Sequence, residues 1–142
     1  MKITPLSAVG AEVTEVDVTV LTAVQDAQLK AAFAQHGLLI FRDQDLTEAD
    51  HIGLAERWGQ INTNRFFKAH ADYPQIALVD KTPDQIQNIG GDWHTDHSYD
   101  QIPALGSILV ARMLPETGGD TWFASMYRAF DQLSNGLKTL LL

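Results

Sequence analysis

Hydrophobic and polar residues follow three successive patterns in the first part of the chain. In residues 11–20 valines alternate with polar residues, which is typical of a half-buried strand. After Thr22, a suitable cap residue, apolar side chains recur at helical spacing until Gly37, where a left-handed residue can end a helix. Residues 38–41 are a short apolar run. We therefore predict a strand, a helix and a second, buried strand.

The middle of the chain is less regular. We predict a turn at residues 43–45, a second helix that begins after Thr47, a loop over residues 60–73 and a strand over residues 76–79. Residues 81–92 are polar and contain Pro83, Gly90 and Gly91. This composition predicts an irregular loop that could act as a lid and that leads directly to a strand at His94.

The last third combines an apolar run with helical spacing. Residues 104–113 are apolar almost throughout, which predicts a strand covered on both faces, and residues 115–119 would turn it into a hairpin with residues 120–123. From Ser125 the pattern becomes helical, breaks near residues 134–136 and resumes at Leu137. No repeat or linker interrupts the chain, so we expect one mixed α+β domain over residues 1–142.

Composition narrows the classes of function. The 142 residues include 18 acidic and 10 basic ones, a formal charge of −8 without any basic run, which argues against nucleic acid and anionic membranes as partners. We find neither a signal peptide nor an apolar stretch of about 18 residues, and we expect a cytoplasmic protein that acts on small molecules. Because the chain has no cysteine, histidines and carboxylates are left to hold a metal.

His94 and Asp96 form the most informative pair of residues. On a strand they would face the same side and could bind one metal ion, since alternate side chains share a face. One imidazole and one carboxylate are two of the three ligands of the facial triad that holds non-haem Fe(II). The other interpretation is a half-buried histidine bonded to Asp96 or to a backbone carbonyl. His97 would face away from the pair, and His51, on a polar helix face, would be solvated.

Six stretches of the chain resemble the amino-terminal half of one enzyme family, and they occur in the same order. The family is that of the taurine and dichlorophenoxyacetate dioxygenases (TauD/TfdA), which depend on Fe(II) and 2-oxoglutarate. The similar stretches are residues 3–6, 10–13, 36–44 and 55–59, the Trp-His-Thr-Asp of residues 93–96, and residues 114–121, which end in Gly-Gly-Asp-Thr.

The resemblance implies a fold, cofactors and site residues. The fold would be an incomplete double-stranded β-helix, a jelly roll of the clavaminate synthase type with flanking helices. His94 and Asp96 would bind Fe(II), and Thr121 would hydrogen-bond a carboxylate of the co-substrate 2-oxoglutarate. Family members also use a distal histidine and a later arginine, and neither has a counterpart before Leu142. With O₂, such enzymes hydroxylate a small organic substrate and release succinate and CO₂.

The expected substrate contacts depart from the taurine-specific pattern. Where taurine enzymes place an asparagine four residues before the first iron ligand, this chain has Gly90, and where they place a substrate-binding histidine it has Arg65. Arg65 would favour an anion, which gives a sulfonate, a sulfate ester or an aryloxy acid as the expected class. Further candidates for lining the pocket are His70, Tyr73 and His97.

Three other interpretations stay open at this stage. The chain could be a non-catalytic fragment in which two ligands hold iron weakly. A partner chain, or a second copy in a homo-oligomer, could supply the missing strands, histidine and arginine. Finally, the chain could be a cupin-like metal-binding module without oxygenase activity.

Overall fold

The computed structural model describes residues 1–82, 84–88 and 90–142, which divide into two compact units. The first comprises Met1–Asp17, Leu21–Gln44 and Met113–Leu142, and the second Val18–Val20 and Asp45–Arg112. Each unit is assembled from separated stretches of sequence. The single domain expected over residues 1–142 stays a prediction. Of the predicted lid, Pro83 and Ile89 lie outside the described residues.

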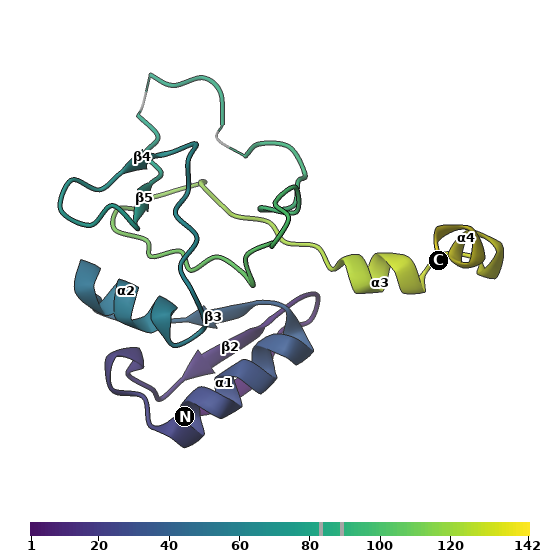
Figure 1. The fold of residues 1–142 in the computed structure, drawn as a ribbon, viewed down its shortest axis with the longest axis horizontal. Coiled ribbons are helices and arrows are strands. Elements are labelled where there is room, and N and C mark those ends of the chain that lie inside the picture. The colour runs from purple at the N-terminus through teal and green to yellow at the C-terminus, as the bar shows by residue number, and fades with distance from the viewer. Residues whose placement is uncertain (83, 89) are drawn as a thin grey trace. The chain divides into compact units, whose positions relative to one another are not determined.

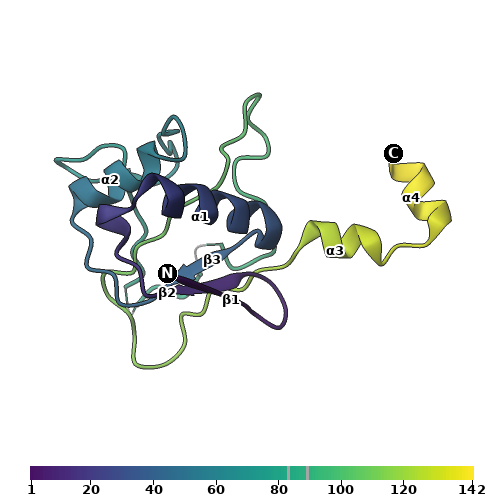
Figure 2. The same cartoon turned by 90° about the horizontal axis from the view of Figure 1, so that it is seen from below.

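The first unit contains a three-stranded sheet in the order β1–β2–β3, formed by β1 (Lys2–Pro5), β2 (Ala11–Thr14) and β3 (Leu39–Phe41). Figure 1 shows β2 and β3, and Figure 2 also shows β1. Strands β1 and β2 are antiparallel, whereas β2 and β3 are parallel. The parallel pair requires a crossover connection, and helix α1 (Ala23–His36) lies within it. Sequence patterns predicted β2 and β3 but not β1.

The strand predicted over residues 11–20 is correct only in its first part. Ala11 and Val13 are buried and alternate with half-buried Glu12 and Thr14, as the period of two requires. At Glu15 the backbone turns to a positive φ of 56°, which ends the strand. The chain continues into a 3₁₀ turn, η1 (Val18–Val20), which belongs to the second unit.

Helix α1 begins and ends where the sequence predicts. The Thr22 hydroxyl accepts a hydrogen bond from the Gln25 backbone N–H (3.2 Å), and the Gln25 side chain accepts one from the Thr22 N–H (2.9 Å), which completes a capping box. Gly37, with a φ of 72°, donates its N–H to the Phe33 carbonyl and ends the helix. The helix lies along the sheet (Figure 2). It buries Leu29 and Ala32.

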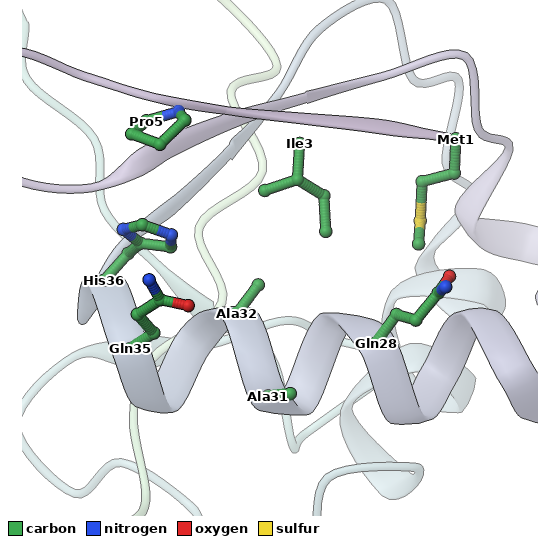
Figure 3. A pocket seen from close by; sticks show the side chains of 8 residues that line it. All are labelled: Met1, Ile3, Pro5, Gln28, Ala31, Ala32, Gln35 and His36. Carbon is green, nitrogen blue, oxygen red and sulfur yellow. The ribbon is translucent and has the colours of Figure 1, made fainter.

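A shallow groove of about 440 Å³ separates one edge of α1 from β1. Side chains of β1, among them Ile3, point toward the helix, and Ala32 and His36 line the opposite wall (Figure 3). None of the predicted site residues lines this groove, so it does not bear on the metal chemistry.

The second unit is built around helix α2 (Glu48–Glu56), which Thr47 caps as predicted. His51 on α2 was expected to be solvated, and this expectation is wrong: its ring is half-buried and its Nε2 lies 3.1 Å from the Ile108 carbonyl oxygen, to which it donates. Arg112 also reaches this helix, since it pairs with Glu48 (3.3 Å) and donates to the Leu46 carbonyl. These contacts tie residues 108–112 to α2.

A two-stranded ribbon completes the regular structure of this unit. Strand β4 (Lys68–Ala69) lies inside the stretch predicted as a loop, and β5 (Ala77–Leu78) lies inside the predicted strand. They pair antiparallel, with Lys68 opposite Leu78.

Residues 91–125 contain no helix or strand, so the strands predicted at His94 and over residues 104–113, and the hairpin with residues 120–123, are absent. A strand needs a neighbour for its backbone N–H and C=O groups, and no described segment pairs with these residues. Large apolar side chains such as Leu109, Met113 and Trp122 are consequently exposed. The mixed helix and strand content is as predicted.

The end of the chain is helical, as its spacing predicts. Ser125 caps α3 (Met126–Asp131), and Ser134 caps α4 (Asn135–Leu141), so the second helix begins two residues before the predicted Leu137. No helix in the described part of the chain is long and apolar enough to cross a membrane.

Candidate metal centre

His94 and Asp96 lie side by side although the segment that carries them is not a strand. The His94 Nε2 atom is 3.3 Å from Asp96 Oδ1, and both side chains are more than half exposed. The contact therefore arises from an irregular turn of the backbone and not from the alternation of a strand.

The hydrogen bonds of the His94 ring determine which nitrogen is available. Nδ1 lies 2.8 Å from the Asp92 backbone carbonyl, which can only accept, so Nδ1 must carry a proton. In the neutral ring Nε2 then has a bare lone pair, and this lone pair faces the Asp96 carboxylate. A backbone carbonyl that orients the remote nitrogen is the usual support for a metal-binding histidine.

The spacing of the two facing atoms can be compared with that of ligands on one metal ion, since His94 Nε2 and Asp96 Oδ1 are 3.3 Å apart. Two ligand atoms at right angles, each about 2.1 Å from an octahedral ion, are about 3 Å apart. The pair therefore has the chemistry and the spacing of two adjacent metal ligands.

Two neighbours constrain the pair. The Ser107 hydroxyl donates to Asp96 Oδ2 at 3.1 Å, which leaves Oδ1 for an ion. Gly90, at a φ of +64°, lies against the ring: a Cβ added there would be 3.0 Å from His94 Cε1. Glycine therefore suits the positive φ at this position, and a larger residue would crowd the imidazole.

We predict that Gly90→Ala weakens Fe(II) binding roughly ten-fold, because the new methyl group displaces the His94 ring. Titration with Fe(II) under nitrogen measures the effect. Gly37→Ala is the matched control, since Gly37 also has a positive φ but nothing lies within 4 Å of its added Cβ. Equal Kd values for the two variants would contradict this prediction, because they would show that the closeness of residue 90 to the His94 ring has no effect on Fe(II) binding.

Within the described residues, no group of three His, Asp or Glu side chains could hold a metal ion. His94 and Asp96 therefore remain a candidate pair of ligands, and their binding of a metal stays a prediction. Thr121 is exposed and belongs to the first compact unit, whereas His94 and Asp96 belong to the second. Its contact with a co-substrate stays a prediction.

Arg65 and His97 meet at a third residue that sequence reasoning did not single out, Asp100. Arg65 Nη2 donates to Asp100 Oδ1, and His97 Nδ1 donates to Asp100 Oδ2 at 3.0 Å. Asn62 Nδ2 lies 3.4 Å from the same Oδ2. The only available signal was an acidic residue three positions after a histidine in a turn-rich stretch.

Asn64 fixes the His97 ring from the other side. Its Oδ1 accepts the N–H groups of Phe66 (2.8 Å) and Phe67 (3.1 Å), so its Nδ2 must face His97 Nε2, at 3.4 Å. Nε2 is then the acceptor and Nδ1 carries the proton that goes to Asp100. This hydrogen bond from His97 holds the pKa of the Asp100 carboxyl below its usual range, and the charge of Arg65 and the Asn62 amide act in the same direction.

His70 and Tyr73 form a separate turn. His70 Nδ1 accepts the backbone N–H groups of Asp72 (3.2 Å) and Tyr73 (3.3 Å), and the rings of His70 and Tyr73 lie 5.5 Å apart. The His70 proton is therefore on Nε2. Their role in lining a substrate pocket stays a prediction.

The likeness suggested by the sequence motifs is confirmed by comparison with known proteins. The profile of the family described as "Taurine catabolism dioxygenase TauD, TfdA family" matches residues 2–142. This chain belongs to the TauD/TfdA family. A relative from Sphingobium herbicidovorans, an (S)-phenoxypropionate/alpha-ketoglutarate-dioxygenase, is 33% identical over 140 residues, which cover 96% of this chain and 49% of the relative.

Solved structures of TauD/TfdA proteins have the same fold over this length. A taurine dioxygenase from Burkholderia xenovorans matches with a TM-score of 0.85 at 29% identity, covering 99% of this chain and 50% of that one. The protein AAD-2, solved with Mn(II) and N-oxalylglycine, matches with a TM-score of 0.77 at 29% identity, covering 99% and 49%. The chain therefore spans about half the length of the relatives it matches. Members of the family are 2-oxoglutarate-dependent dioxygenases.

Proposed function

We propose that His94 and Asp96 hold Fe(II) in the site of a 2-oxoglutarate-dependent dioxygenase that hydroxylates a small anionic organic molecule. The observation that carries this proposal is the approach of His94 Nε2 to Asp96 Oδ1 at 3.3 Å, with His94 Nδ1 held by the Asp92 carbonyl. In the family, Fe(II) with 2-oxoglutarate and O₂ supplies oxidative decarboxylation to succinate and CO₂, coupled to hydroxylation.

In such a site this chain would supply two metal ligands, His94 and Asp96, and would hold their side chains in a fixed orientation. The Asp92 carbonyl keeps the His94 proton on Nδ1, and Ser107 restrains Asp96. The third protein ligand and the arginine for the far carboxylate of 2-oxoglutarate would come from outside these residues. We propose further that the complete fold is the jelly roll of the family, in which residues 104–113 would find the strand partners that the described residues lack.

Thr121 is the proposed contact to a carboxylate of 2-oxoglutarate. Thr121→Ala should raise the Kd of 2-oxoglutarate about three- to ten-fold, which corresponds to one lost hydrogen bond to a charged group, and should leave Fe(II) affinity unchanged. Calorimetric titration of the two ligands separately measures both values. Thr139→Ala is a suitable control because the Thr139 hydroxyl bonds only to the Asn135 carbonyl of its own helix. If both affinities fall together, Thr121 serves folding instead.

The anionic character of the substrate rests on Arg65. Its guanidinium belongs to the same compact unit as the metal ligands, and its side chain is 65% exposed. A sulfonate, sulfate ester or carboxylate offers the two oxygens that a guanidinium binds best. The names of the relatives agree with this class, since phenoxypropionate carries a carboxylate and taurine a sulfonate. Arg65→Ala should therefore remove binding of such anions.

A metal-binding module without oxygenase activity is the second candidate, and the two-ligand centre favours it for the chain taken alone. Because the third ligand and the arginine would come from outside these residues, succinate production under air distinguishes the two only when those groups are supplied. A dioxygenase consumes 2-oxoglutarate in proportion to bound Fe(II), whereas a metal-binding module binds Fe(II) and releases no succinate. A partner chain that supplies the third ligand would restore succinate production when it is added.

A further inference from the structure

We infer that Asp100 is a built-in counter-ion of Arg65 that the anionic group of the substrate displaces, so that Asp100 sets the affinity of this site for anions. The inference rests on the proposed function and identifies a specificity-determining residue within it. Its basis is the unequal way in which the two partners of the ion pair are held.

Asp100 is firmly anchored without Arg65. Its Oδ2 accepts from His97 Nδ1 at 3.0 Å and lies 3.4 Å from Asn62 Nδ2, and its side chain is only 15% exposed. Asn64 in turn holds His97 in the tautomer that donates to Asp100. The carboxylate would therefore keep its position and its charge if the guanidinium moved away.

Arg65, in contrast, is held loosely. Only Nη2 binds Asp100, through one oxygen, although a guanidinium has five N–H donors and prefers to bind a carboxylate with two of them. Its side chain is 65% exposed. The Phe66 ring lies 5.8 Å from the guanidinium carbon and would support the cation in either position.

An exchange between two anions follows from this asymmetry. A sulfonate or carboxylate that binds two guanidinium nitrogens gains more than the single hydrogen bond it replaces, while Asp100 retains His97 and Asn62. Because the Asp100 carboxylate is ionised at neutral pH, it competes with every incoming anion for the Arg65 guanidinium. A neutral ligand cannot replace the carboxylate in this ion pair and therefore gains no affinity from Arg65. The pair would thereby select ligands with at least two anionic oxygens.

The test is Asp100→Asn in the 142-residue chain, with methanesulfonate and acetate as probes. The amide keeps the shape, and its oxygen can still accept from His97, but the competing charge is gone. Exposed ion pairs contribute about 0.2–1 kcal/mol, so the Kd of both probes should fall up to about five-fold, and methanol as a neutral probe should be unaffected. Titrations followed by NMR measure these values.

Three further variants separate the possible causes. Asp84→Asn makes the same change of net charge, but the Asp84 carboxylate accepts a hydrogen bond from Thr82 and not from Arg65. The Kd values of this variant for both probes should therefore equal those of the wild type. Asp100→Glu retains the charge and should not tighten binding. Arg65→Ala should abolish it. A Kd in Asp100→Asn that is equal to or higher than that of the wild type overturns the inference.

The outcome for Arg65→Ala distinguishes this inference from the proposed function. If that variant loses anion binding while Asp100→Asn changes nothing, only the counter-ion role of Asp100 fails. If Arg65→Ala binds the probes normally, the proposed anion site itself is wrong. Should Asp100→Asn not fold, the carboxyl ¹³C resonance of Asp100 in the wild type decides, because it must shift when methanesulfonate saturates the site; an unmoved resonance refutes the exchange.

Discussion

His94→Ala is expected to abolish Fe(II) binding. The His94 imidazole is one of the two ligands proposed among the described residues, and without it a single exposed carboxylate would hold the ion, which should lower the affinity at least about 100-fold. Paramagnetic broadening of backbone amide signals during an anaerobic Fe(II) titration detects even weak binding and locates it on the chain. In the wild type the broadening should centre on residues 92–96.

The control for this experiment is His36→Ala. His36 is the last residue of α1 and lines the groove beside β1, where none of the predicted metal ligands is found. Its removal also takes one imidazole from the chain, so it accounts for nonspecific binding to histidine. If His94→Ala retains the broadening at residues 92–96, the assignment of His94 as an iron ligand must be abandoned.

Leu29→Ala is expected to reduce the free energy of unfolding of the first unit by about 3 kcal/mol. Leu29 is fully buried on α1, and replacing a buried leucine by alanine costs about 2–5 kcal/mol through lost burial and the cavity left behind. Among the residues that the structure describes, the buried apolar side chains are few: Ala11, Val13, Val18, Leu21, Leu29, Ala32, Leu46 and Leu54. Urea denaturation followed by circular dichroism measures the loss.

Val24→Ala provides the comparison on the same helix. Val24 is 68% exposed, so its truncation should change stability by less than about 0.5 kcal/mol. Similar losses for the two variants would mean that α1 does not pack as described. Fe(II) binding followed in parallel would show whether the second unit depends on the first.

Elements with a local cause were predictable from the sequence. Helix α1 is defined by Thr22 at its start and Gly37 at its end, and both act through hydrogen bonds to residues three or four positions away. The caps at Thr47, Ser125 and Ser134 work in the same way. Short-range interactions of this kind depend little on the rest of the fold.

Strands were less predictable because a strand is completed by a neighbour distant in the sequence. The apolar run of residues 104–113 has the composition of a buried strand, yet no described segment pairs with it, and its side chains stay largely exposed. The strand expected at His94 failed for the same reason. Conversely, β1 exists because β2 pairs with it, although its own pattern gave no signal.

The same distinction between local and long-range interactions applies to the candidate site. The sequence by itself determined the family and supplied the prediction of one imidazole and one carboxylate ligand separated by one residue, because these are properties of neighbouring residues in a motif. Only the tertiary structure decided that Asp92 orients His94, that Ser107 restrains Asp96 and that Arg65 pairs with Asp100. The last two contacts join residues 11 and 35 positions apart, and such contacts follow from the path of the folded chain, which residue types alone do not specify.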